Sequence, residues 1–203
     1  MDEANLTRRA VGGIFWSYLS FISGKGLAFI TTIILARLLT PAEFGLMGYC
    51  LIALQYLDIL NVAGFDSALI SQKDNIEDAA NTAFLSNLLL GIIWLVIAWL
   101  GAPLVAGFFK TAEVTPTFRV LAFTLPIAGL GLVPDAMIQR SLRFRTRLFS
   151  DLARNLSKGL VSIGMALSGF GVWSLVGGQI AGVTAGTAFS WRLAKWKPSW
   201  RFN

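Results

Sequence analysis

The chain has 203 residues, of which 55% are hydrophobic and only 14% are charged, and its formal net charge is +6. A soluble domain is nearer half apolar and a quarter charged, so this composition favours a membrane protein. The chain contains no His and one Cys, Cys50, which excludes an intrachain disulfide, a Cys/His zinc site and an imidazole base. It also has neither a phosphate-binding loop nor a dinucleotide-binding glycine motif. We therefore expect no enzyme activity, no metal and no cofactor.

Long apolar runs follow one another along the chain, and a helix needs roughly 20 such residues to cross a bilayer. The first run stops before Pro41, which cannot continue a helix. The third follows Asp74-Asn-Ile-Glu77, which has the spacing of a capping box. The last apolar stretch is long enough for two crossings, and Ser168-Gly-Phe-Gly171 supplies a turn in its middle. The predicted spans are 11–36, 44–63, 79–100, 118–138, 152–168 and 172–191, and the apolar run of the third also allows an extension through Phe109.

These spans predict an all-α fold, a polytopic membrane protein in which residues 1–203 form a single six-transmembrane-helix bundle. The short intervals between the spans carry eleven Lys and Arg residues on one side and three on the other. Basic residues accumulate on the cytoplasmic side, so we expect both termini to be cytoplasmic. The eleven are Arg8, Arg9, Lys73, Arg140, Arg143, Arg145, Arg147, Arg192, Lys195, Lys197 and Arg201, and the three are Arg37, Lys110 and Arg119.

The positive charge lies beside apolar spans, so it indicates orientation and contact with membrane lipids rather than a nucleic-acid partner. Its densest part is Arg143, Arg145 and Arg147, ahead of the fifth span. One interpretation is a contact with anionic lipid headgroups. The alternative is an orientation signal alone, for which the excess of basic residues on this side is sufficient.

Small residues recur at every fourth position in two of the predicted spans. The sixth span has Gly178, Gly182 and Gly186, and the first has Gly24 in a similar series. Helices in lipid approach each other closely through such residues, so we expect these faces to be helix–helix contacts. The alternative is that small residues fall at this spacing by chance in a Gly-rich span.

Several charged residues lie at depths that a bilayer should exclude. Lys25 is near the middle of the first span, and Arg154 and Lys158 lie one turn apart on one face of the fifth. A charge at bilayer depth costs at least about 2.5 kcal/mol, so it faces a partner or a wet cavity. Asp58 and Asp151 are the candidate counter-charges, and structural ion pairs such as Lys25 with Asp58 or Arg154 with Asp151 are one reading. The other is a cationic cavity that binds a phosphate or diphosphate, because bases outnumber acids.

Five segments occur in order over most of the chain. They are Leu35-Ala-Arg-Leu-Leu-Thr-Pro-Ala-Glu-Phe-Gly45, Ser67-Ala-Leu-Ile-Ser-Gln-Lys73, Gln139-Arg-Ser-Leu-Arg-Phe-Arg145, Gly169-Phe-Gly-Val-Trp-Ser-Leu-Val-Gly-Gly-Gln179 and Trp196-Lys-Pro-Ser-Trp-Arg-Phe202. Together they resemble the signatures of the polysaccharide transporter family. This family belongs to the multidrug/oligosaccharidyl-lipid/polysaccharide flippase superfamily, which includes the O-antigen flippases.

The resemblance implies two six-helix lobes that face each other across a central cavity, of which this chain is similar to the N-terminal lobe. It implies translocation of an undecaprenyl-diphosphate-linked oligosaccharide across the bacterial inner (plasma) membrane, for lipopolysaccharide, capsule or exopolysaccharide biosynthesis. One lobe lacks half of the cavity wall, so a second lobe or another chain is an expected partner. Lys25 and Lys158 are assigned to the candidate site because of their charge and their depth in the predicted spans, and not because of the resemblance.

Two other functions remain open from the sequence. The chain could be a non-transporting membrane scaffold of a polysaccharide assembly complex. It could also be a drug or cation exporter of the same superfamily, which would favour buried acids over the buried bases present here.

Overall fold

The computed structural model describes residues 22, 24–62, 76–140 and 144–194, and every regular element within them is a helix. This confirms the expected all-α class for this part of the chain. A helical stretch over residues 24–38 comes first. It is followed by α2 (Pro41–Val62), α4 (Ile76–Phe108), α5 (Val114–Leu121), α6 (Thr124–Arg140), α7 (Phe144–Leu167) and α8 (Val172–Ala194).

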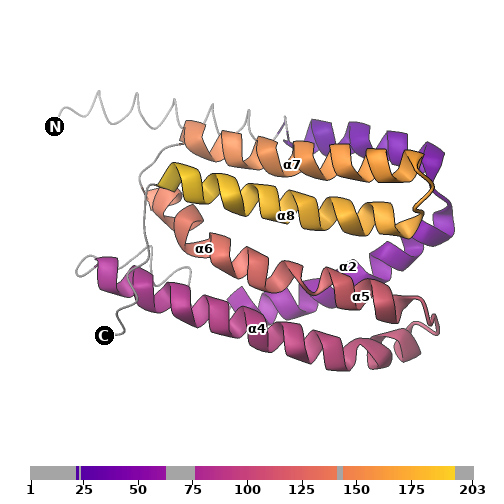
Figure 1. The fold of residues 1–203 in the computed structure, drawn as a ribbon, viewed down its shortest axis with the longest axis horizontal. Helices are drawn as coiled ribbons and strands as arrows, with labels where there is room; N and C mark the ends of the chain where they lie inside the picture. Colours follow the sequence, from indigo (N-terminus) through magenta and orange to yellow (C-terminus); the bar gives the residue numbers. More distant parts are fainter. Residues whose placement is uncertain (1–21, 23, 63–75, 141–143, 195–203) are drawn as a thin grey trace.

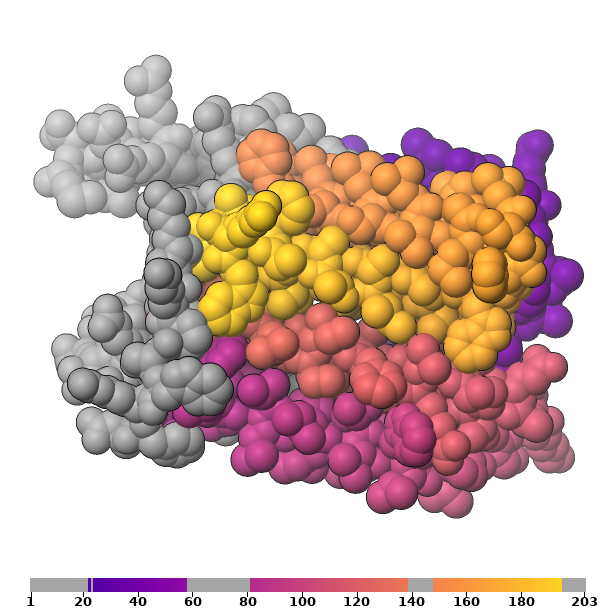
Figure 2. Space-filling model, in the orientation of Figure 1, coloured from indigo at the N-terminus to yellow at the C-terminus, as the bar shows by residue number. Residues whose placement is uncertain are grey.

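The long helices α7, α8, α6 and α4 lie side by side in a row, and α5 precedes α6 at one end of it (Figure 1). Helix α2 crosses behind this row and contacts α4, α5 and α8. The stretch 24–38 runs beside α7. In the view of Figure 2, α7 and α8 cover one half of the face, and α4, α5 and α6 cover the other.

The centre and the outside of the bundle are both apolar. Cys50 of α2, Ala102 of α4 and Leu121 of α5 are completely inaccessible in the main core cluster. The outer side of α4 is open, and its Leu104 and Phe108 side chains are 79% and 81% exposed. A run of exposed apolar side chains is unfavourable in water and suits the hydrocarbon of a bilayer.

Two stretches of the described chain, Asn81–Phe108 and Val114–Ile138, are long and apolar enough to cross a membrane. They correspond to the spans expected at 79–100 and 118–138. The other helices of the described chain do not meet this criterion by themselves.

The second of these stretches is divided into α5 and α6. The Thr124 hydroxyl donates to the Leu121 carbonyl at 2.6 Å and occupies an acceptor that a continuous helix would use. Pro126 follows at the third position of α6 and has no N–H for the ladder. The chain therefore bends at residues 122–123 within one expected span.

Helix α2 begins at Pro41, three residues before the expected start of the second span. The Thr40 N–H donates to Glu43 Oε2 at 2.6 Å, and the Glu43 N–H donates to Thr40 Oγ1 at 3.4 Å. This reciprocal pair is a capping box, and proline suits the first helical position because its missing N–H is not needed there. The Thr-Pro-Ala-Glu segment is thus a signal that starts a helix.

Helix α4 continues past residue 100 and through Pro103 to Phe108, close to the longer of the two ends that the sequence allows. Pro103 has no N–H to offer the carbonyl of Trp99, one turn earlier. Arg119 of α5 donates from Nε to that carbonyl at 3.2 Å, and its guanidinium lies 4.6 Å from the centre of the Trp99 ring. The side chain of Arg119 therefore replaces the helical hydrogen bond that the proline removes.

Helix α6 contains a second proline of this kind. Pro134 leaves the carbonyl of Leu130 without its helical donor. Trp191 of α8 donates from Nε1 to that carbonyl at 2.9 Å, and its ring packs edge-on against Phe84 of α4 at 5.6 Å. One indole thus joins α4, α6 and α8.

Trp191→Phe is expected to destabilise the protein by about 1 kcal/mol, because the ring remains but the Leu130 carbonyl loses its donor. Thermal unfolding in detergent would measure this as a lower midpoint. Trp173→Phe in the same helix is the matched control, since Trp173 is exposed. Equal midpoints for the two variants would contradict the assignment.

The turn between α7 and α8 lies at the residues expected for it. Gly169 and Gly171 have φ values of +79° and +56°, in the left-handed region that favours glycine. The Phe170 N–H donates to the Met165 carbonyl at 3.2 Å, and the Gly169 N–H to the Ala166 carbonyl at 3.0 Å. This pattern ends α7 as a Schellman motif. At its other end, α7 starts at Phe144 rather than at the expected residue 152.

Candidate functional site

The polar residues Arg154, Asn155, Lys158 and Ser162 form a polar stripe on one face of α7, and they are divided between two neighbouring helices. Asn155 faces the N-terminal stretch, where a Cβ on Gly24 would lie 3.1 Å from Asn155 Nδ2. Arg154, Lys158 and Ser162 face α8 instead. These side chains share one face of α7, and that face therefore lies between the stretch 24–38 and α8.

The glycines of α8 make the contact with α7 possible. A Cβ on Gly178 would lie 2.7 Å from the Lys158 carbonyl oxygen, and one on Gly182 would lie 3.0 Å from the Arg154 carbonyl oxygen. Real Cβ atoms essentially never come closer than 3.0 Å to another heavy atom and rarely come as close as that, so these two glycines let the helix backbones touch. Figure 1 shows α7 and α8 closely paired along their length.

Gly186 has a different role in the same series. A Cβ there would lie 2.5 Å from Arg154 Nε and 3.0 Å from Arg154 Nη2. Gly186 therefore leaves space for the guanidinium to pass across α8, not for a closer approach of the two backbones.

The guanidinium of Arg154 reaches α6. Its Nη2 lies 3.7 Å from Oδ2 of Asp135, and the two side chains are 43% and 34% exposed. The other carboxylate oxygen, Oδ1, accepts a hydrogen bond from the hydroxyl of Ser190 on α8. Ser150 of α7 lies 3.5 Å from the same hydroxyl. Asp135 thus joins α6, α7 and α8 at one point.

Asp135 was not among the counter-charges expected from the sequence. It is an acid inside the predicted span 118–138, and its depth is the signal that could have identified it. Of the two expected acids, Asp151 is half-buried on α7 and its carbonyl accepts from Asn155 at 2.9 Å. Asp58 lies in α2, but its side chain is outside the described part of the structure.

The guanidinium of Arg154 has an N–H donor that no acceptor of the described chain uses. Within the described chain, its Nε is buried and has no hydrogen-bond acceptor. Lys158, one turn further on, is an exposed residue. Lys25 is also exposed and follows Gly24 directly, so it lies near the level of Asn155. Lys25, on the stretch 24–38, therefore lies near the level of the two α7 cations, Arg154 and Lys158.

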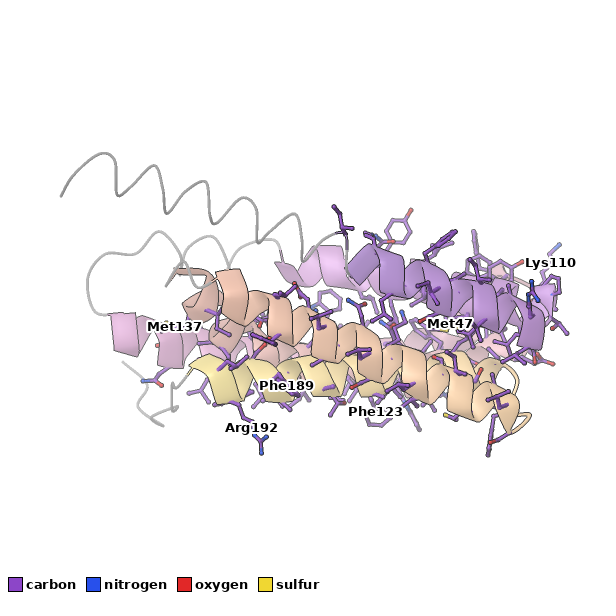
Figure 3. The ribbon with its side chains drawn as sticks, turned by 90° about the horizontal axis from the view of Figure 1, so that it is seen from above. Met47, Lys110, Phe123, Met137, Phe189 and Arg192 are labelled. Carbon is purple, nitrogen blue, oxygen red and sulfur yellow. The ribbon has the colours of Figure 1, made fainter. Side chains whose placement is uncertain are left out.

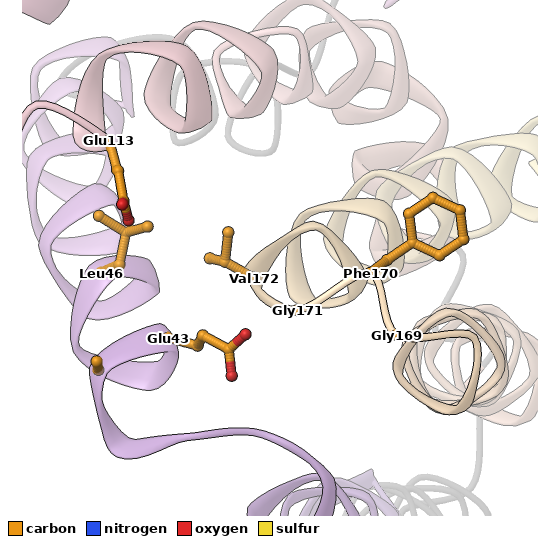
Figure 4. Close-up of a pocket in the computed structure, with 8 residues that line it drawn as sticks. Glu43, Leu46, Glu113, Gly169, Phe170, Gly171 and Val172 are labelled. Atoms are coloured by element: carbon orange, nitrogen blue, oxygen red, sulfur yellow. The ribbon is translucent and has the colours of Figure 1, made fainter.

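A cavity of about 270 Å³ lies at the α7–α8 turn, roughly 20 Å along α7 from Arg154. It is lined by the start of α2, Glu113 and residues 169–172. In Figure 4 the carboxylate of Glu43 points toward Gly171, which it contacts, and the Phe170 ring points away. Two carboxylates make this cavity unsuitable for an anionic ligand, so we do not assign the phosphate site to it.

Basic residues lie toward both ends of the bundle. Figure 3 shows Lys110 at one end and Met137 and Arg192 toward the other. Arg143 lies outside the described residues, and Arg145 and Arg147 belong to the first turn of α7, with side chains that the structure does not describe. The expected contact of these three residues with anionic lipid stays a prediction.

The helical fold, the exposed apolar side chains and the charged stripe between helices define an α-helical membrane protein. Comparison with known families then identifies the family to which this membrane protein belongs. The chain belongs to the family described as polysaccharide biosynthesis protein, which matches residues 34–203.

Three relatives support this membership. The succinoglycan biosynthesis transport protein ExoT of Rhizobium meliloti (strain 1021) is 26% identical over 201 residues, which cover 99% of this chain and 40% of ExoT. The teichuronic acid biosynthesis protein TuaB of Bacillus subtilis (strain 168) is 25% identical over 202 residues, 98% of this chain and 42% of TuaB. The lipopolysaccharide biosynthesis protein WzxC of Escherichia coli (strain K12) is 24% identical over 140 residues, 69% of this chain and 28% of WzxC.

The chain therefore spans about two fifths of the length of the first two relatives. No solved structure matches it significantly.

Proposed function

We propose that this chain is one lobe of a membrane transporter that moves lipid-linked oligosaccharide or polysaccharide precursors across the bacterial inner membrane. The family and the names of the relatives support a role in polysaccharide biosynthesis, and the name of ExoT includes transport. The single observation that carries the proposal is that Arg154 and Lys158 of α7 are held against the glycines of α8.

In this proposal the chain crosses the membrane six times, with both termini in the cytoplasm. The exposed apolar side of α4 supports contact with lipid, and the eleven-to-three distribution of basic residues supports the orientation. The cavity at Glu43 and Glu113 then lies toward the non-cytoplasmic side, because it is at the α7–α8 turn.

The proposed site binds the phosphate groups of the carrier lipid through Lys25, Arg154 and Lys158. A guanidinium offers several donors to phosphate oxygens, and an ammonium adds a point charge. The nearby acids of the described chain are Asp135 and Asp151, so bases exceed acids and an anionic group would balance the charge. A drug or cation exporter would need the opposite balance.

A lobe of this size encloses a lipid-linked sugar from one side only. The relatives are more than twice as long as the part that this chain matches. We therefore include in the proposal a second lobe or another chain that completes the wall around the sugar.

Lys25→Ala and Lys158→Ala are each expected to lower polysaccharide export by more than about tenfold, because a phosphate contact in a low-dielectric site is lost. Export would be measured in the source strain after deletion of its own gene, with each variant expressed in its place. Lys110→Ala, at the other end of the bundle, is the matched control. Undiminished export by both variants at normal expression would refute the cationic site.

A further inference from the structure

Asp135 uses its two carboxylate oxygens for different contacts. Oδ1 accepts from Ser190, which is completely buried in α8, so the carboxylate is fixed to a rigid part of the bundle. Oδ2 lies 3.7 Å from the guanidinium of Arg154, which is longer than a charge-assisted hydrogen bond. Asp135 is therefore held firmly by α8 and only loosely by Arg154.

Arg154 is free to exchange this partner. Its side chain crosses Gly186 without a Cβ in the way, and 43% of it is exposed. Its buried Nε has no acceptor within the described residues, so the guanidinium can donate to a further anionic group. In the proposed site, a charge inside the membrane must keep some compensation, and Asp135 supplies it until such a group arrives.

We propose that Asp135 is a resident counter-ion of Arg154, which the diphosphate of a lipid-linked substrate must displace. Asp135 thereby weakens the binding of that headgroup and allows its release. This inference rests on the proposed function of the cationic site. Asp135 acts through Arg154 and is a positioning residue, because its carboxylate and the phosphate are both anionic and would not contact each other.

The test is the binding of undecaprenyl diphosphate to the protein in nanodiscs of zwitterionic lipid. Asp135→Asn is expected to tighten this binding by about fivefold, the value of a half-exposed ion pair, and to slow transport. Damage to the fold would weaken binding. Tighter binding would therefore show that the substitution acts on the binding site and not on folding. Glu113→Gln, an exposed acid near the distant cavity, is the matched control and should leave the affinity unchanged.

Two further measurements test whether Asp135 acts through Arg154 and whether it changes the binding of the phosphate groups. In an Arg154→Ala background, Asp135→Asn should no longer tighten binding, because the residue through which it acts is gone. Inorganic pyrophosphate, added without any carrier lipid, should also bind more tightly to Asp135→Asn. Tightening for the lipid alone would overturn the assignment to the phosphate groups.

Ser190→Ala provides an independent variant that preserves every charge. Without the Ser190 hydroxyl, the carboxylate loses one hydrogen-bond donor and should attract the guanidinium of Arg154 more strongly, so lipid binding should weaken a few-fold. If the wild type does not bind undecaprenyl diphosphate, the proposed function itself fails. If the wild type binds but neither variant shifts the affinity in its stated direction, only the role of Asp135 fails.

Discussion

Gly182→Leu is expected to prevent α7 and α8 from packing, which would leave little folded protein in the membrane. Even a Cβ at this position would lie 2.9 Å from Lys158 Cβ and 3.0 Å from the Arg154 carbonyl oxygen. The backbone of α7 cannot yield as a flexible side chain could, so the helices would have to separate. We expect a loss of about 3 kcal/mol or more, at the upper end of the range for overpacked positions.

The measurement is the fraction of protein that elutes as a single species after detergent extraction, together with its thermal midpoint. Gly164→Leu on α7 is the matched control, because a Cβ there meets nothing within 4 Å. Normal assembly of the Gly182 variant would show that close contact between these two helices is not needed for the fold.

Arg154→Ala is expected to abolish polysaccharide export and also to lower stability. The export loss, more than about tenfold, follows from the loss of the proposed phosphate donor, and the instability follows because Asp135 loses its ion-pair partner Arg154. The two effects have different causes and can therefore be separated in one further variant.

The double variant Arg154→Ala with Asp135→Ala removes both charges. It should recover most of the thermal stability, because no charge remains without its partner. Export should stay as low as in the single variant, because the phosphate donor is still absent. Recovery of export in the double variant would mean that Arg154 serves only to neutralise Asp135.

The helices themselves follow from sequence, because apolar run length and local capping chemistry determine where they begin and end. Ser168-Gly-Phe-Gly171 predicts the α7–α8 turn from residue types alone, and both its glycines take up positive φ. Residue types alone do not decide whether α4 ends at residue 100 or extends through Phe109. It continues past Pro103 because Arg119, from another helix, donates to the carbonyl that the proline leaves open.

The composition of the candidate site was less predictable than the helices. Helical spacing places Arg154 and Lys158 on one face of α7, but it contains no information about the helix that this face meets. The partner of Arg154 depends on the position of α6 beyond α8, which is a property of the tertiary packing. For the same reason, spacing alone could not distinguish Gly186, which accommodates a side chain, from Gly182, which accommodates a backbone.

The binding of undecaprenyl diphosphate in nanodiscs, compared between the wild type and a variant with Lys25, Arg154 and Lys158 all replaced by Gln, tests the cationic site most directly. Glutamine preserves much of the side-chain volume and removes the charge. We expect the wild type to bind this lipid in preference to phosphatidylglycerol, and the triple variant to lose that preference. Retention of the preference by a folded triple variant would contradict the cationic site.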